Sequence, residues 1–251
     1  MKAKKEKRFR KRSIKLEGEL DELKRYLEEV QIQKQQEQLR ALQSQINPHF
    51  LYNSLDAIRG LALEHSEFEV SDAVGTLSSM FKYTMDFQKM LVSVTSEVSQ
   101  IERYLKMQNF RFMDRFQLKK VYECEIETLN RLMLPKFTLQ PLVENAVVHG
   151  LRSRTKDAEI EMRFTHVGNE FLIMVSDNGD GIEEEYIAKL NRIFAGEEAA
   201  DTDSQINNGI ALPNVDARIK FYYGEEYGLS LASTKGAGTD VTVRIPYMEC
   251  V

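Results

Sequence analysis

Apolar residues recur at helical spacing along the first part of the chain. Between residues 16 and 30 a leucine or valine returns every three or four positions, with Glu, Lys and Arg between them, which is the pattern of a coiled-coil seam. The seam consists of Leu16, Leu20, Leu23, Leu27 and Val30. A coiled coil needs a partner helix, so the pattern favours a homodimer over one long surface helix within a monomer.

A second helical pattern begins after the glutamine-rich residues 31–38. Its apolar positions run in a shifted register, the kind of break called a stutter, and continue to Leu61. A short connection at 64–67 precedes another amphipathic helix over about 70–84. Two antiparallel helices paired across a dimer would make a four-helix bundle. We therefore assign residues 1–38 to a basic start and signalling helix, and residues 39–93 to all-α dimerisation helices.

Residues 94–251 have a different pattern. A third helix is predicted from Thr95 or Ser96 to about Phe112. After it, strands are predicted at 116–125, 160–164, 171–175, 229–232 and 241–245, and helices at 139–149, 183–193 and 213–222. This order, with a hairpin turn at Gly168-Asn169, predicts a mixed α/β sandwich and not a doubly wound parallel sheet.

The charge distribution is uneven. Residues 1–15 hold nine Lys or Arg against Glu6 alone, a net +8, which leaves −13 for the rest of a chain whose net charge is −5. Such a block is typical of a nucleic-acid arm, a targeting signal, a solvated tail or the cytoplasmic flank of a membrane segment. Neither an apolar signal region nor a run of about 18 apolar residues follows it. The charge alone leaves the solvated tail and the membrane flank open.

Histidine and cysteine are too scattered to predict a zinc site or a disulfide framework. One histidine stands out. His49 follows Pro48 within the second helical pattern, in the stretch QINPHFLYN that ends at Asn53. A proline inside a helix removes a backbone donor at a cost of about 3 kcal/mol, so its presence beside a titratable side chain suggests a function. The alternative is an ordinary packed or half-exposed histidine on a helix seam.

Two stretches of the second domain combine polar residues with a regular element. In the helix predicted at 139–149, Pro141, Asn145 and His149 are spaced by four and share a face that could coordinate a ligand. Asp177 opens the sequence DNGDG after an apolar strand and could accept a hydrogen bond from an amino group. The two glycines of this sequence would let the backbone approach a flat ligand closely. Taken alone, the sequence is equally that of an ordinary Asp-Gly turn.

A third stretch, NNGIALPN at 207–214, is a glycine loop that opens a helix. Free N–H groups at a helix N-terminus suit a phosphate group. The preceding residues 194–205 are small and acidic, a composition that predicts either a mobile lid or a disordered loop.

In combination these stretches resemble a known family. A helix with Glu144-Asn145, then Asp-x-Gly-x-Gly, a lid, Gly-Ile-x-Leu-x-Asn and Gly-x-Gly-Thr resembles the ATP-binding domain shared by histidine kinases, gyrase and the heat-shock 90 chaperones. The stretch around His49 resembles the histidine box of the LytS/YesM-type sensor histidine kinases. The resemblance covers residues 39–247, and it implies dimerisation helices followed by a GHKL or Bergerat-type ATP-binding sandwich. Together with the basic start, it implies the cytoplasmic portion of an inner-membrane protein, with a sensor or membrane segment upstream and no nucleic-acid partner.

The resemblance implies a role for each matching residue. His49 looks like the phosphate acceptor, with Asn53 orienting its ring or a water molecule. ATP and Mg²⁺ are the implied cofactors, Asn145 the metal ligand, and a response-regulator aspartate the final acceptor. The remaining nucleotide contacts implied are His149, Asp177 for the adenine amino group with Gly179 and Gly181, Gly209, Ile210 and Leu212 over the phosphates, and Thr239 behind the adenine.

Four positions depart from the family pattern. Phe50 leaves no carboxylate directly after His49, and Val148 stands where relatives often carry a basic residue. Ala211 replaces a second glycine, and Pro141 replaces the glutamate with which related ATPases activate water. Pro141 therefore favours phosphoryl transfer to a side chain over an ATP-driven clamp or chaperone. Val148 and Ala211 favour an alternative function, that of a catalytically weak nucleotide-binding regulatory module that acts through dimer contacts.

Overall fold

The structure is a computed structural model that describes residues 48–86, 89–198 and 211–247. The predicted coiled coil, Gly209 and Ile210 lie outside the described residues. The chain divides into two units, Met1–Ser54 and Leu55–Val251, which we describe separately. No described helix combines the length and apolar character that crossing a bilayer requires.

The predicted helices near the start of the described region are present. The helix that carries His49, α2 (Pro48–Glu64), is followed by α3 (Phe68–Met85). Their connection turns at Ser66, whose φ of 60° is left-handed, and the N–H of Glu67 donates to the carbonyl of Ala62 at 2.8 Å. Because residue 47 is not described, the predicted position of Pro48 inside a longer helix stays a prediction.

Helix α4 (Val94–Phe112) begins slightly earlier than predicted. Its cap is Ser93, whose hydroxyl accepts the N–H of Ser96 at 3.2 Å, an arrangement that satisfies a backbone donor at the helix start. Three short elements that the pattern did not predict surround it. They are β1 (Leu91–Ser93), α5 (Ile126–Arg131) and β3 (Met133–Pro135), and β1 pairs with β3 in an antiparallel ladder.

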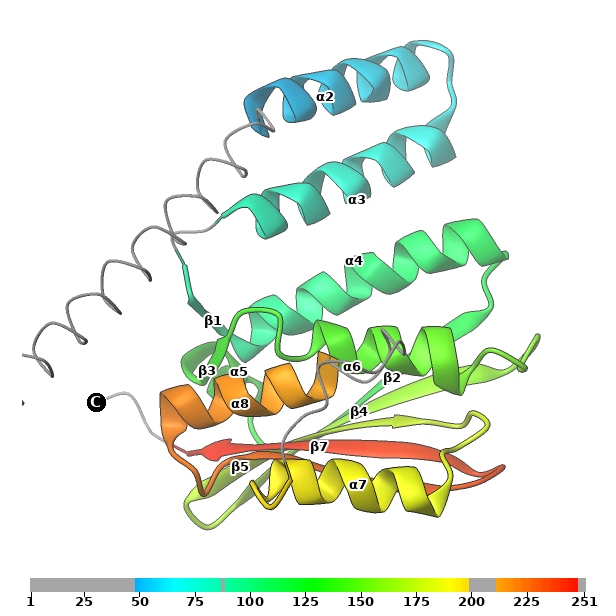
Figure 1. Cartoon of the computed structure of the whole chain (residues 1–251). Helices are drawn as coiled ribbons and strands as arrows, with labels where there is room; N and C mark the ends of the chain where they lie inside the picture. Colours follow the sequence, from blue (N-terminus) through cyan, green and yellow to red (C-terminus); the bar gives the residue numbers. More distant parts are fainter. Residues whose placement is uncertain (1–47, 87–88, 199–210, 248–251) are drawn as a thin grey trace, which may run out of the picture. The chain divides into compact units, whose positions relative to one another are not determined.

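The main sheet has five strands in the order β2-β4-β5-β7-β6 (Figure 1). Their bounds are β2 (Phe116–Glu123), β4 (Ala158–Val167), β5 (Glu170–Asp177), β6 (Gly228–Thr234) and β7 (Gly238–Pro246). The β2–β4 pair is parallel and the other pairs are antiparallel. The predicted mixed sheet is confirmed, and the hairpin turn falls at Gly168 as expected.

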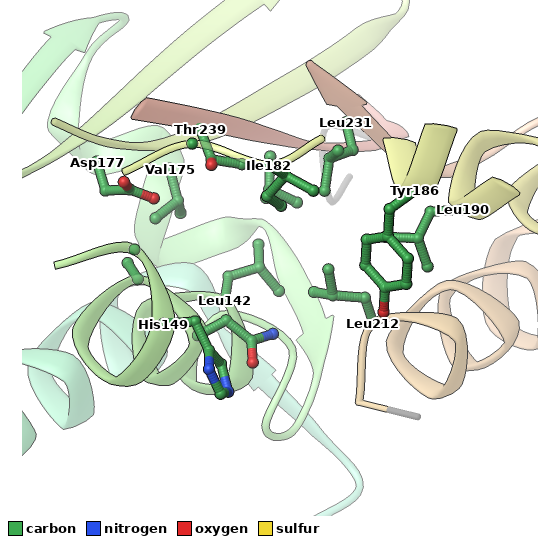
Figure 2. A pocket seen from close by; sticks show the side chains of 15 residues that line it. Leu142, His149, Val175, Asp177, Ile182, Tyr186, Leu190, Leu212, Leu231 and Thr239 are labelled. Carbon is green, nitrogen blue, oxygen red and sulfur yellow. The ribbon is translucent and has the colours of Figure 1, made fainter. Parts of the chain in front are cut away.

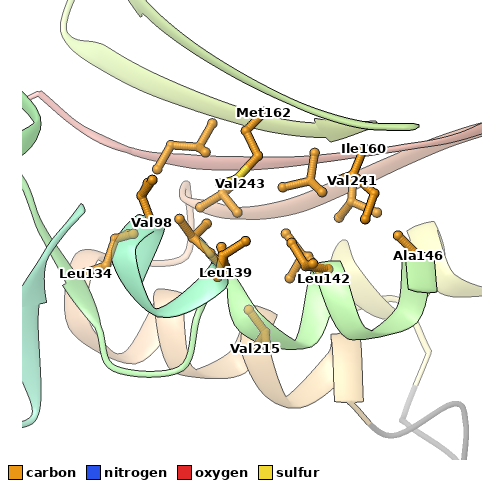
Figure 3. Close-up of a cluster of buried hydrophobic side chains, with 14 of the residues drawn as sticks. Val98, Leu134, Leu139, Leu142, Ala146, Ile160, Met162, Val215, Val241 and Val243 are labelled. Atoms are coloured by element: carbon orange, nitrogen blue, oxygen red, sulfur yellow. The ribbon is translucent and has the colours of Figure 1, made fainter. Parts of the chain in front are cut away.

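One face of this sheet is buried under helices. The alternating side chains of β4, β5 and β7 turn one set inward, as their burial shows. Figure 3 shows Ile160, Met162 and Val243 of the sheet over apolar side chains of the helices. Those helices are α4, α6 (Gln140–Asn145) and α8 (Ala211–Tyr223). The opposite face carries ion pairs such as Lys119–Glu161, so the domain is a two-layer sandwich.

Candidate functional site

A pocket of about 270 Å³ opens between the buried face of the sheet and the helices. This volume is near the lower end of the ~300–1,000 Å³ of small-molecule sites. Figure 2 shows Asp177 and Thr239 on one side of the pocket, His149 on another and Tyr186 at a third. Six of the residues predicted from the sequence line it: Asn145, His149, Asp177, Gly181, Leu212 and Thr239.

Asp177 is the charged group at the deep side of the pocket. It ends β5 and pairs in register with Thr239 of β7. Burial and, to a smaller extent, the neighbouring Asp240 raise the pKa of Asp177 to about 6, although the N–H of Gly179, which donates to Oδ1 at 2.8 Å, opposes the shift. At neutral pH the side chain is mostly a carboxylate, so it can accept a hydrogen bond from an amino group inside an apolar cavity.

Two glycines beside Asp177 are required for different reasons. Gly181 lines the pocket with a φ of +66°, and a Cβ there would overlap the carbonyl of Thr234. Gly179 lies outside the lining, and a Cβ on it would overlap the carbonyl of Gly150. Of the two glycines predicted to shape a wall against the ligand, Gly181 thus lines the pocket directly, and Gly179 lets its loop approach the backbone of Gly150.

The helix that carries Asn145 changes its winding directly after that residue. Helix α6 passes into a π-helical turn, η1 (Ala146–Gly150), in which the N–H of Leu151 donates to the carbonyl of Ala146 at 2.7 Å. The wider turn places Asn145, His149 and Gly150 in the pocket lining, whereas Pro141 is not part of it. Of the three residues predicted to share a ligand-facing side of this helix, Asn145 and His149 line the pocket and Pro141 does not. Single π-turns of this kind often occur at functional sites.

Leu212 and Thr239 line two different sides of the pocket, Thr239 next to Asp177 and Leu212 near Tyr186 (Figure 2). Leu212 lies at the start of α8, next to the undescribed residues 199–210. Thr239 is buried, and its hydroxyl lies 3.0 Å from that of Ser233, which in turn donates to the carbonyl of Gly238 at 2.6 Å. Ser233 also accepts the N–H of Ile182 at 2.9 Å. Its side chain therefore links Ile182 and Thr239, which both line the pocket.

His49 lies in the other unit, on the described part of α2. Its side chain is exposed, and the amide nitrogen of Asn53, one turn later, is 3.3 Å from Nδ1 and 3.5 Å from Nε2. The predicted proximity of these two side chains is therefore present. Phe50 beside them is 69% exposed.

Comparisons with known proteins match both parts of the chain. Residues 37–116 match the histidine kinase family, and residues 135–249 match the family of histidine kinase-, DNA gyrase B- and HSP90-like ATPases. Both parts of the chain are thus similar to histidine kinases.

The chain is also similar to curated sensor proteins. It is 32% identical over 209 residues to the sensor histidine kinase YesM of Bacillus subtilis, covering 83% of this chain and 33% of YesM. It is 35% identical over 213 residues to the sensor protein LytS of Streptococcus mutans, covering 84% of this chain and 34% of LytS. The chain spans about one third of the length of these relatives. The predicted resemblance to the LytS/YesM type and the predicted ATP-binding fold are confirmed.

The pocket is also lined by residues that belong to none of the sequence motifs. They are mainly apolar: Leu142, Val175, Ile182, Tyr186, Leu190, Leu231 and Val241. Val175, Leu231 and Val241 are inward-facing positions of their strands, so the alternation pattern could have identified them. Tyr186 and Leu190 are four residues apart on α7 (Glu184–Phe194) and share one face of it.

The described residues fit the ATP that this ATPase family implies. Apolar side chains border the cavity, as a flat base requires, and the half-buried carboxylate of Asp177 is placed among them. Among residues 48–86, 89–198 and 211–247 there is no group of three or more His, Cys, Asp or Glu side chains that could hold a metal. A metal bound here would therefore rely on phosphate oxygens together with a few protein groups, which is the usual arrangement for Mg²⁺.

Proposed function

We propose that this chain is the kinase core of a LytS/YesM-type sensor, which transfers the γ-phosphoryl group of ATP to His49 and from there to a response-regulator aspartate. The observation that carries the proposal is the pocket itself, where Asp177 and Asn145 line one apolar cavity in a chain that also presents an exposed histidine on a helix. The similarity of both parts to histidine kinases supports the pairing of these two features.

The adenine would occupy the apolar part of the pocket. Its exocyclic amino group would donate to Asp177, while Thr239, which pairs with Asp177 across the sheet, would back the ring. Gly181 would present bare backbone to the edge of the base. Only glycine fits at this position, since a Cβ would overlap the carbonyl of Thr234. A buried acceptor left unpaired by the wrong base costs about 1–3 kcal/mol, so this contact would select for adenine.

The phosphate groups would lie toward α6, η1 and the start of α8. Asn145 would hold Mg²⁺ through its amide oxygen, and His149 would contact the nucleotide from the same turn. When bound, Mg²⁺ offsets phosphate charge between the β- and γ-phosphoryl groups. Leu212, with Gly209 and Ile210 before it in the chain, would close over the phosphates. This position for a glycine loop agrees with the preference of phosphate for helix starts.

His49 would act as the nucleophile. A lone pair on one imidazole nitrogen forms a bond to the γ-phosphorus, the bond from phosphorus to the bridging oxygen breaks, and ADP carries away that electron pair. Turned by half a rotation, the Asn53 amide would place its oxygen on Nδ1, accept the Nδ1–H and leave the Nε2 lone pair for attack. The proton leaves from the ring after transfer, and an aspartate of the regulator then accepts the phosphoryl group.

The proposal includes the assembly around this core. Helices α2 and α3 carry large apolar side chains that are more than 40% exposed, among them Ile58, Leu61 and Phe68. A second copy of the chain would cover them in a homodimer. The protein would work at the cytoplasmic side of an inner membrane, with the basic residues 2–15 near anionic lipid.

A second candidate is a nucleotide-binding regulatory module that does not transfer phosphate. It is favoured by Val148, which is 52% exposed beside His149 and offers no cation to a phosphate. This module would bind ATP and would form no acid-labile, base-stable phosphoprotein.

The deciding experiment is incubation of the full chain with γ-labelled ATP and Mg²⁺. We expect base-stable label on the wild type, none on His49→Gln, and strongly reduced label on Asn145→Ala. The matched control is His65→Gln, since His65 is an exposed histidine in the connection after α2. Equal labelling of His49→Gln and wild type would refute the acceptor, and ATP binding without any label would favour the regulatory module.

A further inference from the structure

The segment before helix α6, which carries Asn145, is held in an unusual conformation. Between β3 and α6 the chain passes through Lys136, Phe137 and Thr138, and Phe137 has a φ of 62°. This left-handed conformation is uncommon for a bulky side chain and persists where surrounding contacts hold it in place. Contacts from helices α3, α4 and α8 hold Phe137, and those that hold Lys136 come from the end of α3 and the residues that follow it.

Glu97 of α4 provides the central contact. Its side chain is 1% exposed, and its two oxygens accept backbone donors of the segment, Oε1 from the N–H of Phe137 at 2.8 Å and Oε2 from the N–H of Leu139 at 2.9 Å. A buried carboxylate requires such partners, because its transfer from water is otherwise very unfavourable. One acidic side chain thus fixes both ends of a turn.

The bond between Glu97 and the N–H of Leu139 lies at the start of helix α6. Leu139 is the N-cap residue of α6 and its own side chain supplies no cap. The Glu97 carboxylate takes over this function from a neighbouring helix, because it satisfies a free N–H and places negative charge at the positive end of the helix. Asn145 is the last residue of α6, and His149 belongs to the π-turn that continues it. The position of the helix start therefore sets the position of both pocket residues.

The carbonyl of Phe137 is held by the other helix that borders the pocket. Nη2 of Arg218 on α8 donates to it at 2.5 Å. Leu212 of the pocket lining is at the N-terminal end of the same helix. Phe137 therefore joins α4, α6 and α8 at one point outside the pocket.

Tyr83 joins helix α3 to the same point. Its hydroxyl donates to Oε1 of Glu97, and its ring lies edge-on to Phe137 with the ring centres 5.6 Å apart. Burial and the Glu97 carboxylate both raise the pKa of Tyr83, so the hydroxyl keeps its proton and remains a donor. Nζ of Lys136 donates to the carbonyls of Tyr83 and, at 2.6 Å, Asp86, and lies 4.5 Å from the centre of the Tyr83 ring.

We propose that Glu97 is a positioning residue of the nucleotide site, which holds the phosphate-binding end of the pocket through the start of α6, and that Tyr83 transmits the position of helix α3 to it. The proposal rests on the proposed function, because it takes Asn145 and His149 to face the phosphates. Asp177 lies on β5, outside the bonds that Glu97 makes. Glu97 therefore acts on the phosphate end of the site and not on the adenine end.

This difference gives the test its readout. The affinities of the full chain for ATP with Mg²⁺ and for adenosine are measured by calorimetry, on the wild type, Glu97→Gln and the control Glu102→Gln. Glu102 lies on the same helix, is partly exposed and pairs with Lys120. We expect Glu97→Gln to weaken ATP binding by about tenfold or more and adenosine binding by less than about threefold. The glutamine amide would direct an N–H donor at the N–H of Phe137 or Leu139, so one of the two bonds that hold the start of α6 would be lost. Glu102→Gln should match the wild type for both ligands.

Tyr83→Phe tests the link to α3 and provides a variant that keeps the ring against Phe137. We expect an ATP-specific loss of about threefold, and no further loss when this change is added to Glu97→Gln, because residues that act through one contact are not additive. If Glu97→Gln does not fold, Tyr83→Phe decides alone: an ATP-specific loss supports the proposal, and wild-type affinity overturns it.

The remaining outcomes are distinct. Equal losses of ATP and adenosine binding in Glu97→Gln would mean that Glu97 only stabilises the fold, and would overturn the proposal. Unchanged ATP binding in Glu97→Gln would overturn it as well while leaving the proposed function intact. If the wild type binds no ATP, the proposed function itself fails, and the positioning role fails with it.

Discussion

A Cβ atom on Gly150 would lie 2.6 Å from Oδ1 of Asp177, closer than two such atoms can approach without displacement. The last residue of the π-turn thus packs directly against the carboxylate that ends β5. The N–H of Asp180 donates to the carbonyl of Gly150 at 2.8 Å and holds the two segments together. The proposed adenine side and the proposed phosphate side of the pocket meet at this contact.

Gly150→Ala should therefore weaken ATP binding by about tenfold or more, because an added methyl group must displace the carboxylate or the turn at a typical cost of ~1–3 kcal/mol. Calorimetry with ATP measures the change. The matched control is Gly60→Ala on α2, where nothing lies within 4 Å of the added atom. That variant should bind ATP normally and gain up to ~1 kcal/mol of helix stability. Normal ATP binding by Gly150→Ala would show that the contact does not matter for the nucleotide.

Asp177→Asn should change which base is preferred. The amide keeps one acceptor but adds an N–H donor, so the variant should lose about 10–100-fold in ATP affinity. It should also discriminate less against inosine triphosphate, because the base of that nucleotide carries a carbonyl in place of the amino group. The measured quantity is the ratio of the two affinities. A ratio equal to that of the wild type would place the base recognition elsewhere.

The same residue predicts a pH dependence of stability. Burial raises the pKa of Asp177 from 3.8 to about 6, so the folded protein binds this proton more tightly than the unfolded chain does. The stabilising effect of the proton is fully present below about pH 4 and is lost as the pH rises through about 6. Asp177→Asn should thus be more stable than the wild type by ~1–3 kcal/mol at pH 7.5, with a smaller difference at pH 4.5. Denaturant unfolding without nucleotide at both pH values measures it, and a difference independent of pH would contradict the assignment.

Val148→Lys tests the departure next to the pocket. A cation at this exposed position beside His149 should strengthen ATP binding by about two- to fivefold at low salt and leave adenosine unaffected, because only the phosphates carry charge. The effect should fade as salt is added. An equal change for adenosine would mean that the residue acts on the base or on the fold.

The sequence predicted those parts of the fold in which a simple repeat decides the structure. Strict alternation identified β4, helical spacing identified α3 and the end of α2 to within a few residues, and helix-start signals identified α4. The three-residue strands β1 and β3 are too short to show alternation, and they are fixed by pairing with each other across about forty residues of chain. The domain boundaries predicted at residues 38 and 93 stay predictions.

The site was predicted to a similar degree. The polar residues of the pocket were found through their motifs, but the apolar ones required knowing which strands are neighbours. The π-turn after Asn145 could not be foreseen, because four-residue spacing assumes a regular helix. Glu97 gave only the signal of an acidic residue in the first turn of a helix, and its role depends on the β3–α6 segment about forty residues later in the chain.

The most direct measurement is the identification of the phosphorylated residue. The full chain is incubated with ATP and Mg²⁺, digested at alkaline pH, where phosphohistidine survives, and its peptides are analysed by mass spectrometry with and without acid treatment. The account predicts a phosphoryl group on His49 in the peptide around residues 45–53, lost after acid treatment and absent in Asn145→Ala. A stable phosphoryl group on a hydroxyl residue, or an unmodified His49 in protein that binds ATP, would contradict it.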